Sequence, residues 1–186
     1  MGILRQHFNS AVTAFTLTFA STLPLAAQTS VLDDLFQELL EADEQTHSRI
    51  ADRISGQWER SGSAAIDLLY RRGTDALEEN EPGIAAEHLT AALDHDPTFA
   101  EGYHARASAY YALGMVGPAL DDLRQTLVLE PRHFDAMFGF GVLLEELERY
   151  EDAAEVYRRI QEIYPLDPEA AAGLERISLQ LEGQSL

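Results

Sequence analysis

Residues 92–114, ALDHDPTFAEGYHARASAYYALG, decide the fold because their pattern returns further along the chain. The proline at position 97 is followed by Pro131 and Pro165, each 34 residues after the one before. When the chain is aligned on these prolines, small residues share some columns and large apolar residues share others. Self-similarity at a fixed period of this size is the signature of a repeat architecture.

The columns have a consistent physical meaning. Small residues are expected where two helices cross closely, and large apolar residues fill the gaps on either side. Each proline should end one helix and pre-set the first turn of the next. We therefore predict an all-α, right-handed solenoid of helix–turn–helix units. The small columns are Gly73, Ala107, Gly141 and Ala85, Ala119, Ala153; the large ones are Leu89, Leu123, Tyr157, then Leu69, Tyr103, Met137, and Ala76, Tyr110, Leu144.

This pattern resembles the tetratricopeptide repeat (TPR) family over residues 66–167. The family's order is bulky, small, aromatic, alanine, aromatic and proline, and the middle repeat carries it as Tyr103, Ala107, Tyr110, Ala119, Leu123 and Pro131. The chain departs from the pattern at Arg72 and Arg106, which stand where leucine is usual. We expect their stems to pack while the guanidinium groups reach solvent or a carboxylate.

The repeats and their flanks give the predicted domain organisation. Three repeats are expected at residues 66–99, 100–133 and 134–167, with a capping helix and tail at 168–186, since solenoid ends expose apolar faces that need covering. Residues 28–65 are expected to form an N-terminal helical hairpin, or a degenerate repeat. We expect Trp58 to pack in the core of this hairpin rather than to anchor a ligand.

The first 27 residues are predicted to be a signal peptide. Arg5 precedes an uncharged run over residues 9–27, and small residues at its end place cleavage after Ala27. A retained membrane anchor is the open alternative, because the run is about 20 residues long, enough to span a bilayer. The predicted location is periplasmic or secreted, with no membrane contact once the signal is cleaved.

Composition restricts the function classes. The net charge is −19, and the chain has neither cysteine nor lysine. This excludes disulfides, thiol catalysis and Schiff-base chemistry, and it argues against nucleic-acid partners, which require clustered basic residues. A protein or peptide partner that is neutral or basic is favoured.

The acidic and histidine residues of the opening stretch raise the question of a metal site. Asp94, His95 and Asp96, with His104 nearby, resemble a set of ligands. Their position, however, is the joint between two repeats, and the equivalent joints, VLEP and EIYP, lack a second Asp-His-Asp. No nucleophile elbow or H-E-x-x-H motif occurs, and the histidines at 47, 88, 95 and 133 fall in different columns. We therefore predict no metal, no cofactor and no catalysis.

The TPR resemblance implies that the first helix of each repeat lines a concave groove that holds a partner. The basic clamp by which some members hold a partner's terminal carboxylate is absent. We predict an exported, non-catalytic interaction module or scaffold; the alternative is a self-associating component of a cell-envelope complex, and the oligomeric state is left open. The implied groove residues are Asp67, Glu101, Asp135; Tyr70, His104, Phe138; Thr74, Ser108, Val142; and Leu77, Tyr111, Glu145.

Overall fold

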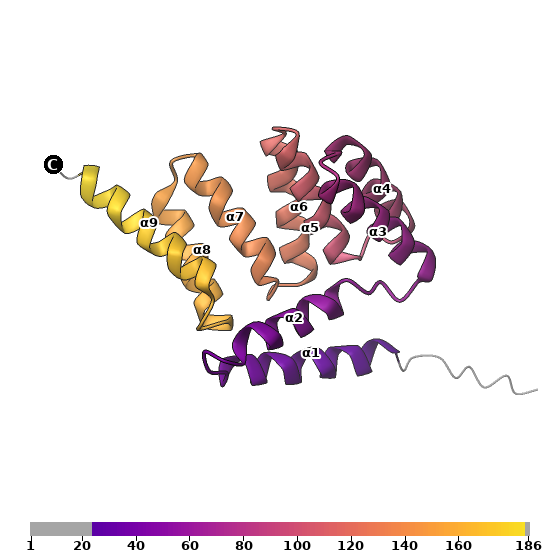
Figure 1. Ribbon diagram of the computed structural model, residues 1–186, viewed down its shortest axis with the longest axis horizontal. Helices are drawn as coiled ribbons and strands as arrows, with labels where there is room; N and C mark the ends of the chain where they lie inside the picture. Colours follow the sequence, from indigo (N-terminus) through magenta and orange to yellow (C-terminus); the bar gives the residue numbers. More distant parts are fainter. Residues whose placement is uncertain (1–23, 185–186) are drawn as a thin grey trace, which may run out of the picture.

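The computed structural model describes residues 24–184, and within that range the chain forms nine α-helices and no strand (Figure 1). The all-α prediction is confirmed. Most of the predicted signal peptide lies outside the described residues. Among the helices described, none is long and apolar enough to cross a membrane. The helices are α1 (Pro24–Leu40), α2 (His47–Trp58), α3 (Ala64–Glu78), α4 (Pro82–His95), α5 (Ala100–Ala112), α6 (Val116–Leu129), α7 (Phe134–Glu146), α8 (Tyr150–Ile163) and α9 (Pro168–Gln184).

Three helix pairs, α3–α4, α5–α6 and α7–α8, stand side by side and are followed by α9 (Figure 1). The prolines at 97, 131 and 165 lie in the turns between pairs, two residues after one helix ends and three before the next begins. They therefore stop the helices, as predicted, but they do not occupy the first turn of the following helix. Pro82 and Pro168, in contrast, do begin helices.

The turn inside each pair closes in the same way. Residues 80, 114 and 148 all adopt positive φ, although only the middle one is glycine: Asn80 has φ 58°, Gly114 73° and Glu148 57°. The next residue's N–H bonds back to the carbonyl five residues before it, at 2.8 Å for Glu81, 2.8 Å for Met115 and 2.9 Å for Arg149. This is the Schellman arrangement that terminates helices, and it recurs with the 34-residue period.

The predicted close crossings are present. An added Cβ at Gly73 would lie 2.5 Å from Leu89, and one at Gly141 would lie 2.5 Å from the ring of Tyr157. A Cβ added at Gly173 of α9 would lie 2.5 Å from the other edge of the same ring. Tyr157 is fully buried, so two glycines clamp it between α7 and α9.

Gly141→Ala should therefore destabilise the protein by about 1–3 kcal/mol, because the new methyl forces a buried ring to shift. The measurement is the free energy of unfolding from urea titration followed by circular dichroism. Gly139→Ala is the matched control in the same helix, since its Cβ would meet Leu123 at an ordinary 3.5 Å. Equal effects of the two substitutions would contradict the clamp.

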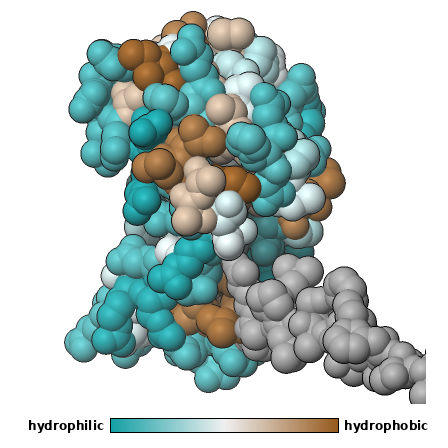
Figure 2. Space-filling view, turned by 90° about the vertical axis from the view of Figure 1, so that its right-hand side faces the viewer, coloured by the Kyte–Doolittle hydropathy of each residue, from teal (hydrophilic) through white to brown (hydrophobic). Residues whose placement is uncertain are grey.

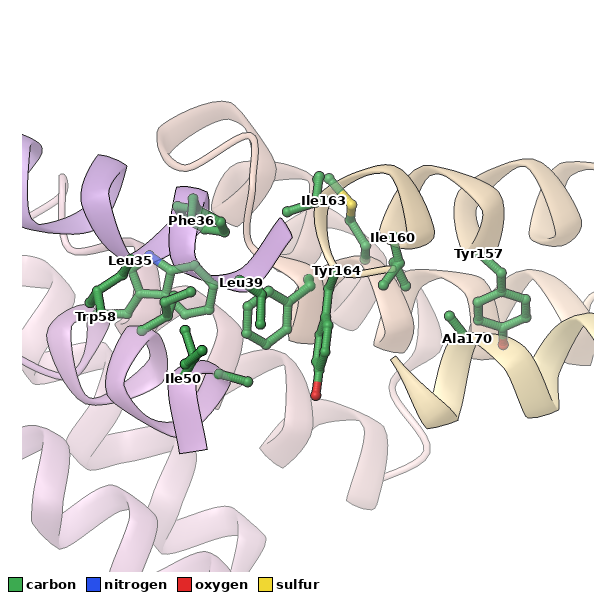
Figure 3. Close-up of a cluster of buried hydrophobic side chains, with 14 of the residues drawn as sticks. Leu35, Phe36, Leu39, Ile50, Trp58, Tyr157, Ile160, Ile163, Tyr164 and Ala170 are labelled. Atoms are coloured by element: carbon green, nitrogen blue, oxygen red, sulfur yellow. The ribbon is translucent and has the colours of Figure 1, made fainter. Parts of the chain in front are cut away.

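The hairpin α1–α2 does not stack before α3 as a further repeat. It lies along one edge of the solenoid, below the other helices in Figure 1, and shares its apolar core with α7, α8 and α9. Figure 3 shows Leu35, Leu39 and Trp58 of the hairpin in one cluster with Ile163 and Tyr164. Trp58 is 7% exposed, so the prediction that it packs in the core is confirmed.

Among residues 24–184, no further helix covers the α3–α4 end of the solenoid. Leu68 of α3 is 43% exposed and Ile84 of α4 is 45% exposed. Figure 2 faces this end of the molecule and shows apolar side chains among hydrophilic ones. The opposite end is covered by α9, whose Ala170 and Ile177 are buried.

Candidate binding groove

Predicted groove residues from both α5 and α7 line one pocket. Its volume is about 230 Å³, and its floor is formed by Ala107, Leu123, Gly139 and Leu143. Five of the twelve predicted residues line its walls: His104, Ser108, Tyr111, Phe138 and Val142. The aromatic and apolar side chains of two neighbouring repeats are thus brought together.

Hydrogen bonds fix the rim of this pocket. The Tyr111 hydroxyl donates to Glu146 of α7, which joins the two walls. Glu145 accepts from the Tyr157 hydroxyl at 2.5 Å and from Arg176 Nη2 at 2.8 Å. Glu145 is therefore held by α8 and α9, away from the pocket lining.

A buried carboxylate lies at the other end of the groove. Glu101 is 8% exposed and is surrounded by three donors. The Tyr70 hydroxyl lies 3.2 Å from its Oε1, His104 Nδ1 lies 3.1 Å from the same oxygen, and His133 Nε2 lies 2.8 Å from Oε2. The predicted groove residues Tyr70 and Glu101 are therefore part of a buried network and not of an open surface. Tyr70 is sequestered because its ring also packs edge-on against Phe99.

The network holds Glu101 in its ionised form. Burial alone would raise its pKa, but the charge and hydrogen bond of His104 and the bond from His133 outweigh burial and lower the pKa to about 2. Burial would likewise lower the pKa of His104, but the neighbouring Glu101 carboxylate outweighs it and raises that pKa. The pair is thus mutually stabilised as carboxylate and imidazolium.

His133 is the member that sequence reasoning missed. It precedes α7, and its Nδ1 accepts the Ala136 N–H at 3.2 Å, which caps that helix. Its column, Phe99, His133 and Asp167, comes just before each first helix. A polar residue at a position filled by phenylalanine one repeat earlier was the available signal.

Glu101, His104 and His133 also have the residue types and the spacing of a metal centre. One ligand atom from each of Glu101, His104 and His133 lies within 4.8 Å of the others. A metal-bound histidine normally donates its second ring N–H to an acceptor. His133 does the reverse: Nδ1 accepts a backbone N–H, so Nε2 carries the proton and donates to Glu101. The geometry is that of a hydrogen-bond network.

The Asp-His-Asp stretch is a turn and is not brought to His104. Asp94 and His95 are exposed at the end of α4. Asp96 accepts from the N–H and hydroxyl of Thr98, at 2.9 and 2.6 Å. These bonds give the side chain a local structural role.

The remaining predicted residues lie apart from the pocket. Asp67 accepts from the backbone and hydroxyl of Ser61, at 2.9 and 2.6 Å, and so fixes the α2–α3 linker. Thr74 and Leu77 are half-buried on α3, where the Thr74 hydroxyl bonds to the Arg71 carbonyl. That any of the twelve residues contacts a partner stays a prediction.

The helix α2 covers the part of the groove that contains the carboxylates of Glu101 and Asp135. The Trp58 ring stacks on His133 with a 4.0 Å centroid distance and a 15° angle between planes. The Ser55 hydroxyl donates to Asp135 at 3.2 Å. The open part of the groove is therefore the pocket between α5 and α7.

Comparison with known proteins agrees with this architecture. The family model described as "Tetratricopeptide repeat" matches residues 70–117 and 104–168. A TPR repeat-containing protein of Rhizobium etli is 32% identical over 82% of this chain and 75% of the relative. The SGT1 homologue of Bos taurus is 32% identical over 61% of this chain, but the match spans only 33% of that protein.

A solved structure shows the same helix arrangement. The first TPR of Spaghetti (RPAP3), bound to the HSP90 peptide SRMEEVD, superposes with a TM-score of 0.62 and 27% identity. The match covers 64% of this chain and 98% of that one.

Proposed function

The chain belongs to the tetratricopeptide repeat family, and we propose that it is a non-catalytic module that binds a segment of another protein in its concave groove. The observation that carries this proposal is the pocket between α5 and α7, with its apolar floor and its aromatic wall of Tyr111 and Phe138. The similar RPAP3 domain binds a peptide, which supports a peptide-like partner here.

The pocket suits one apolar side chain of the partner. Burial of a leucine- or phenylalanine-sized group contributes about 1.5–3 kcal/mol, so further contacts along the groove are needed for tight binding. Acidic side chains lie near the pocket: Glu146 bonds to Tyr111 in its wall, and Glu101 and Asp135 lie towards α2. With no lysine in the chain, a basic or neutral segment is the complementary partner.

We propose further that the protein is exported and that residues 1–27 are removed. The support is the order of a basic residue, an uncharged run and small residues at the N-terminus. The partner would then be a protein of the periplasm or the exterior.

The charge of the partner can be tested with two peptides. SRMEEVD, the RPAP3 ligand, should bind this chain weakly, because its carboxylates meet acidic side chains and no lysine clamp. SRMKKVK, with the acidic residues exchanged for lysine, should bind at least about tenfold more tightly, equivalent to about 1.4 kcal/mol. Isothermal titration calorimetry measures both, and a preference for SRMEEVD would contradict a basic partner.

The pocket itself is tested by capture from a cell-envelope extract with residues 28–186 as bait. A specific partner should be lost with the double variant Tyr111→Ala, Phe138→Ala. It should be retained by Val128→Ala, which removes a 72% exposed apolar side chain from α6. Equal capture by all three baits would place binding outside the groove.

A structural role in self-association is the second candidate. Its support is the uncovered α3–α4 end with exposed Leu68 and Ile84. Light scattering separates the two functions: a stable oligomer that is lost in Leu68→Ser, Ile84→Ser favours self-association, and a monomer favours the binding module.

A further inference from the structure

Carboxylates gather beneath the hairpin without arginine partners. A cavity of about 240 Å³ between α2, α7 and the start of α9 is lined by Asp52, Asp135, Asp167 and Glu169. Glu59, at the end of α2, lies close enough to Glu101 to feel its charge. Within residues 24–184, none of the five unpaired groups, Asp52, Glu59, Asp135, Asp167 and Glu169, appears among the ion pairs with arginine.

On its α2 side the hairpin therefore docks over a surface rich in carboxylates, whereas α1 is held by an ion pair between Asp33 and Arg132 at 2.8 Å. Its apolar contacts hold it in place, through Trp58 on His133 and through the core shared with Tyr164. Ionisation of the unpaired carboxylates opposes docking by mutual repulsion and by the cost of burying charge. Titratable and charged groups face this interface from every element packed against it. The hairpin contributes Asp33, His47, Asp52, Glu59 and Arg60. The solenoid contributes Tyr70, Glu101, His104, Glu130, Arg132, His133, Asp135, Tyr164, Asp167 and Glu169.

The pKa directions agree with this geometry. Burial raises the pKa of Asp135, more than the nearby histidines lower it, and burial is also the main cause of the raised pKa values of Glu59, Asp167 and Glu169. A raised pKa in the folded state means that the stabilisation is fully present below the ordinary value, 3.8 for Asp135, and is lost as pH rises through the folded value. Glu101 acts in the opposite sense. Because its pKa is lowered to about 2, the stabilisation that it contributes is lost only as pH falls towards that value.

We propose that the α1–α2 hairpin is an acid-stabilised cover over the acidic end of the groove. It stays docked in mild acid, and it loosens as the carboxylates beneath it ionise, which uncovers Asp135 and lengthens the open groove. This device operates in the chain alone and does not depend on the proposed partner.

Trp58 is the only tryptophan of the chain, so its emission reports hairpin docking directly. As pH rises above the ordinary carboxyl pKa values of 3.8 and 4.5, Trp58 emission should move to longer wavelength as water reaches the ring. The protection of the α2 amides against hydrogen exchange, corrected for the intrinsic exchange rate, should fall by about tenfold for each unit of pKa shift that docking imposes. The amides of α5 and α6 should keep their protection over the same range.

The variant Asp135→Asn tests the cause, because its amide oxygen still accepts from Ser55 while the titrating charge is removed. Its α2 protection should change with pH clearly less than that of the parent. Asp94→Asn makes the same chemical change at an exposed site and should behave like the parent. Glu59→Gln is a second variant, so a failure of Asp135→Asn to fold does not block the test. Trp58 emission and α2 protection that do not vary with pH in the parent, or the same pH dependence in all variants, would overturn the proposal.

Discussion

Trp58→Ala is expected to lower the free energy of unfolding by about 3–5 kcal/mol, the usual loss for removal of a buried aromatic side chain. The ring contacts three aromatic partners from two parts of the chain: Phe36 of α1 at 6.1 Å, and His133 and Phe134 at the start of α7 at 4.0 and 5.0 Å between centroids. Its removal leaves a cavity where the hairpin meets the solenoid, so the hairpin should lose its docking before the repeats unfold. Urea titration measures the global loss, and hydrogen exchange of α2 measures the local one.

Trp58→Phe is the matched control for this loss. It keeps an aromatic ring over His133 and removes the indole N–H, which is buried without a hydrogen-bond partner. Since an unsatisfied buried donor is itself destabilising, its removal offsets part of the lost contact. The phenylalanine variant should therefore lose clearly less stability than the alanine variant. A similar loss in both would mean that the indole's size, and not its stacking, determines docking.

The repeat architecture was predictable because each column has a local cause. Gly141 and Tyr157 lie 16 residues apart, and the same pairing occurs between Gly73 and Leu89 in the first repeat. A close crossing between consecutive helices depends only on nearby sequence, so one period of columns was enough to predict it. The helix terminations at Asn80 and Glu148 were not predictable in this way, because neither residue type favours positive φ as glycine does.

The position of the hairpin was not predictable from its own pattern. The stripe of Leu35, Phe36 and Leu39 predicts that one face of α1 is buried, but it does not state which surface covers it. The cover proves to be α7–α9, about a hundred residues away, and the hairpin's Trp58 ring also stacks on His133, which donates to Glu101. Of the twelve predicted groove residues, Tyr70 and Glu101 became interior. His104, Tyr111 and Phe138, which depend only on adjacent repeats, line one pocket.

Arg106→Leu should destabilise the protein by about 3–5 kcal/mol, although leucine is the usual residue of the repeat pattern at this position. Arg106 makes two bonds to Asp122, at 2.7 and 2.9 Å, and a third to Thr90 at 3.1 Å. Its guanidinium group also lies 5.5 Å from the ring centres of Tyr103 and Tyr110. Asp122 is only 6% exposed, so leucine at position 106 would leave a buried carboxylate without its partner.

The arginine at position 106, where leucine is usual, is thus explained by its partner Asp122 in the facing helix. The double variant Arg106→Leu, Asp122→Leu should recover most of the loss, because apolar replacement of a whole buried ion pair is often neutral. A double-mutant cycle from urea titrations measures the coupling. Arg124→Leu is the control: its pair with Asp121 is 2.9 Å long but largely exposed, so its loss should stay within about 1 kcal/mol. If Arg106→Leu also cost no more than this, the Arg106–Asp122 pair would contribute as little as a surface pair, and the tyrosines and helix crossings alone would hold α5 against α6.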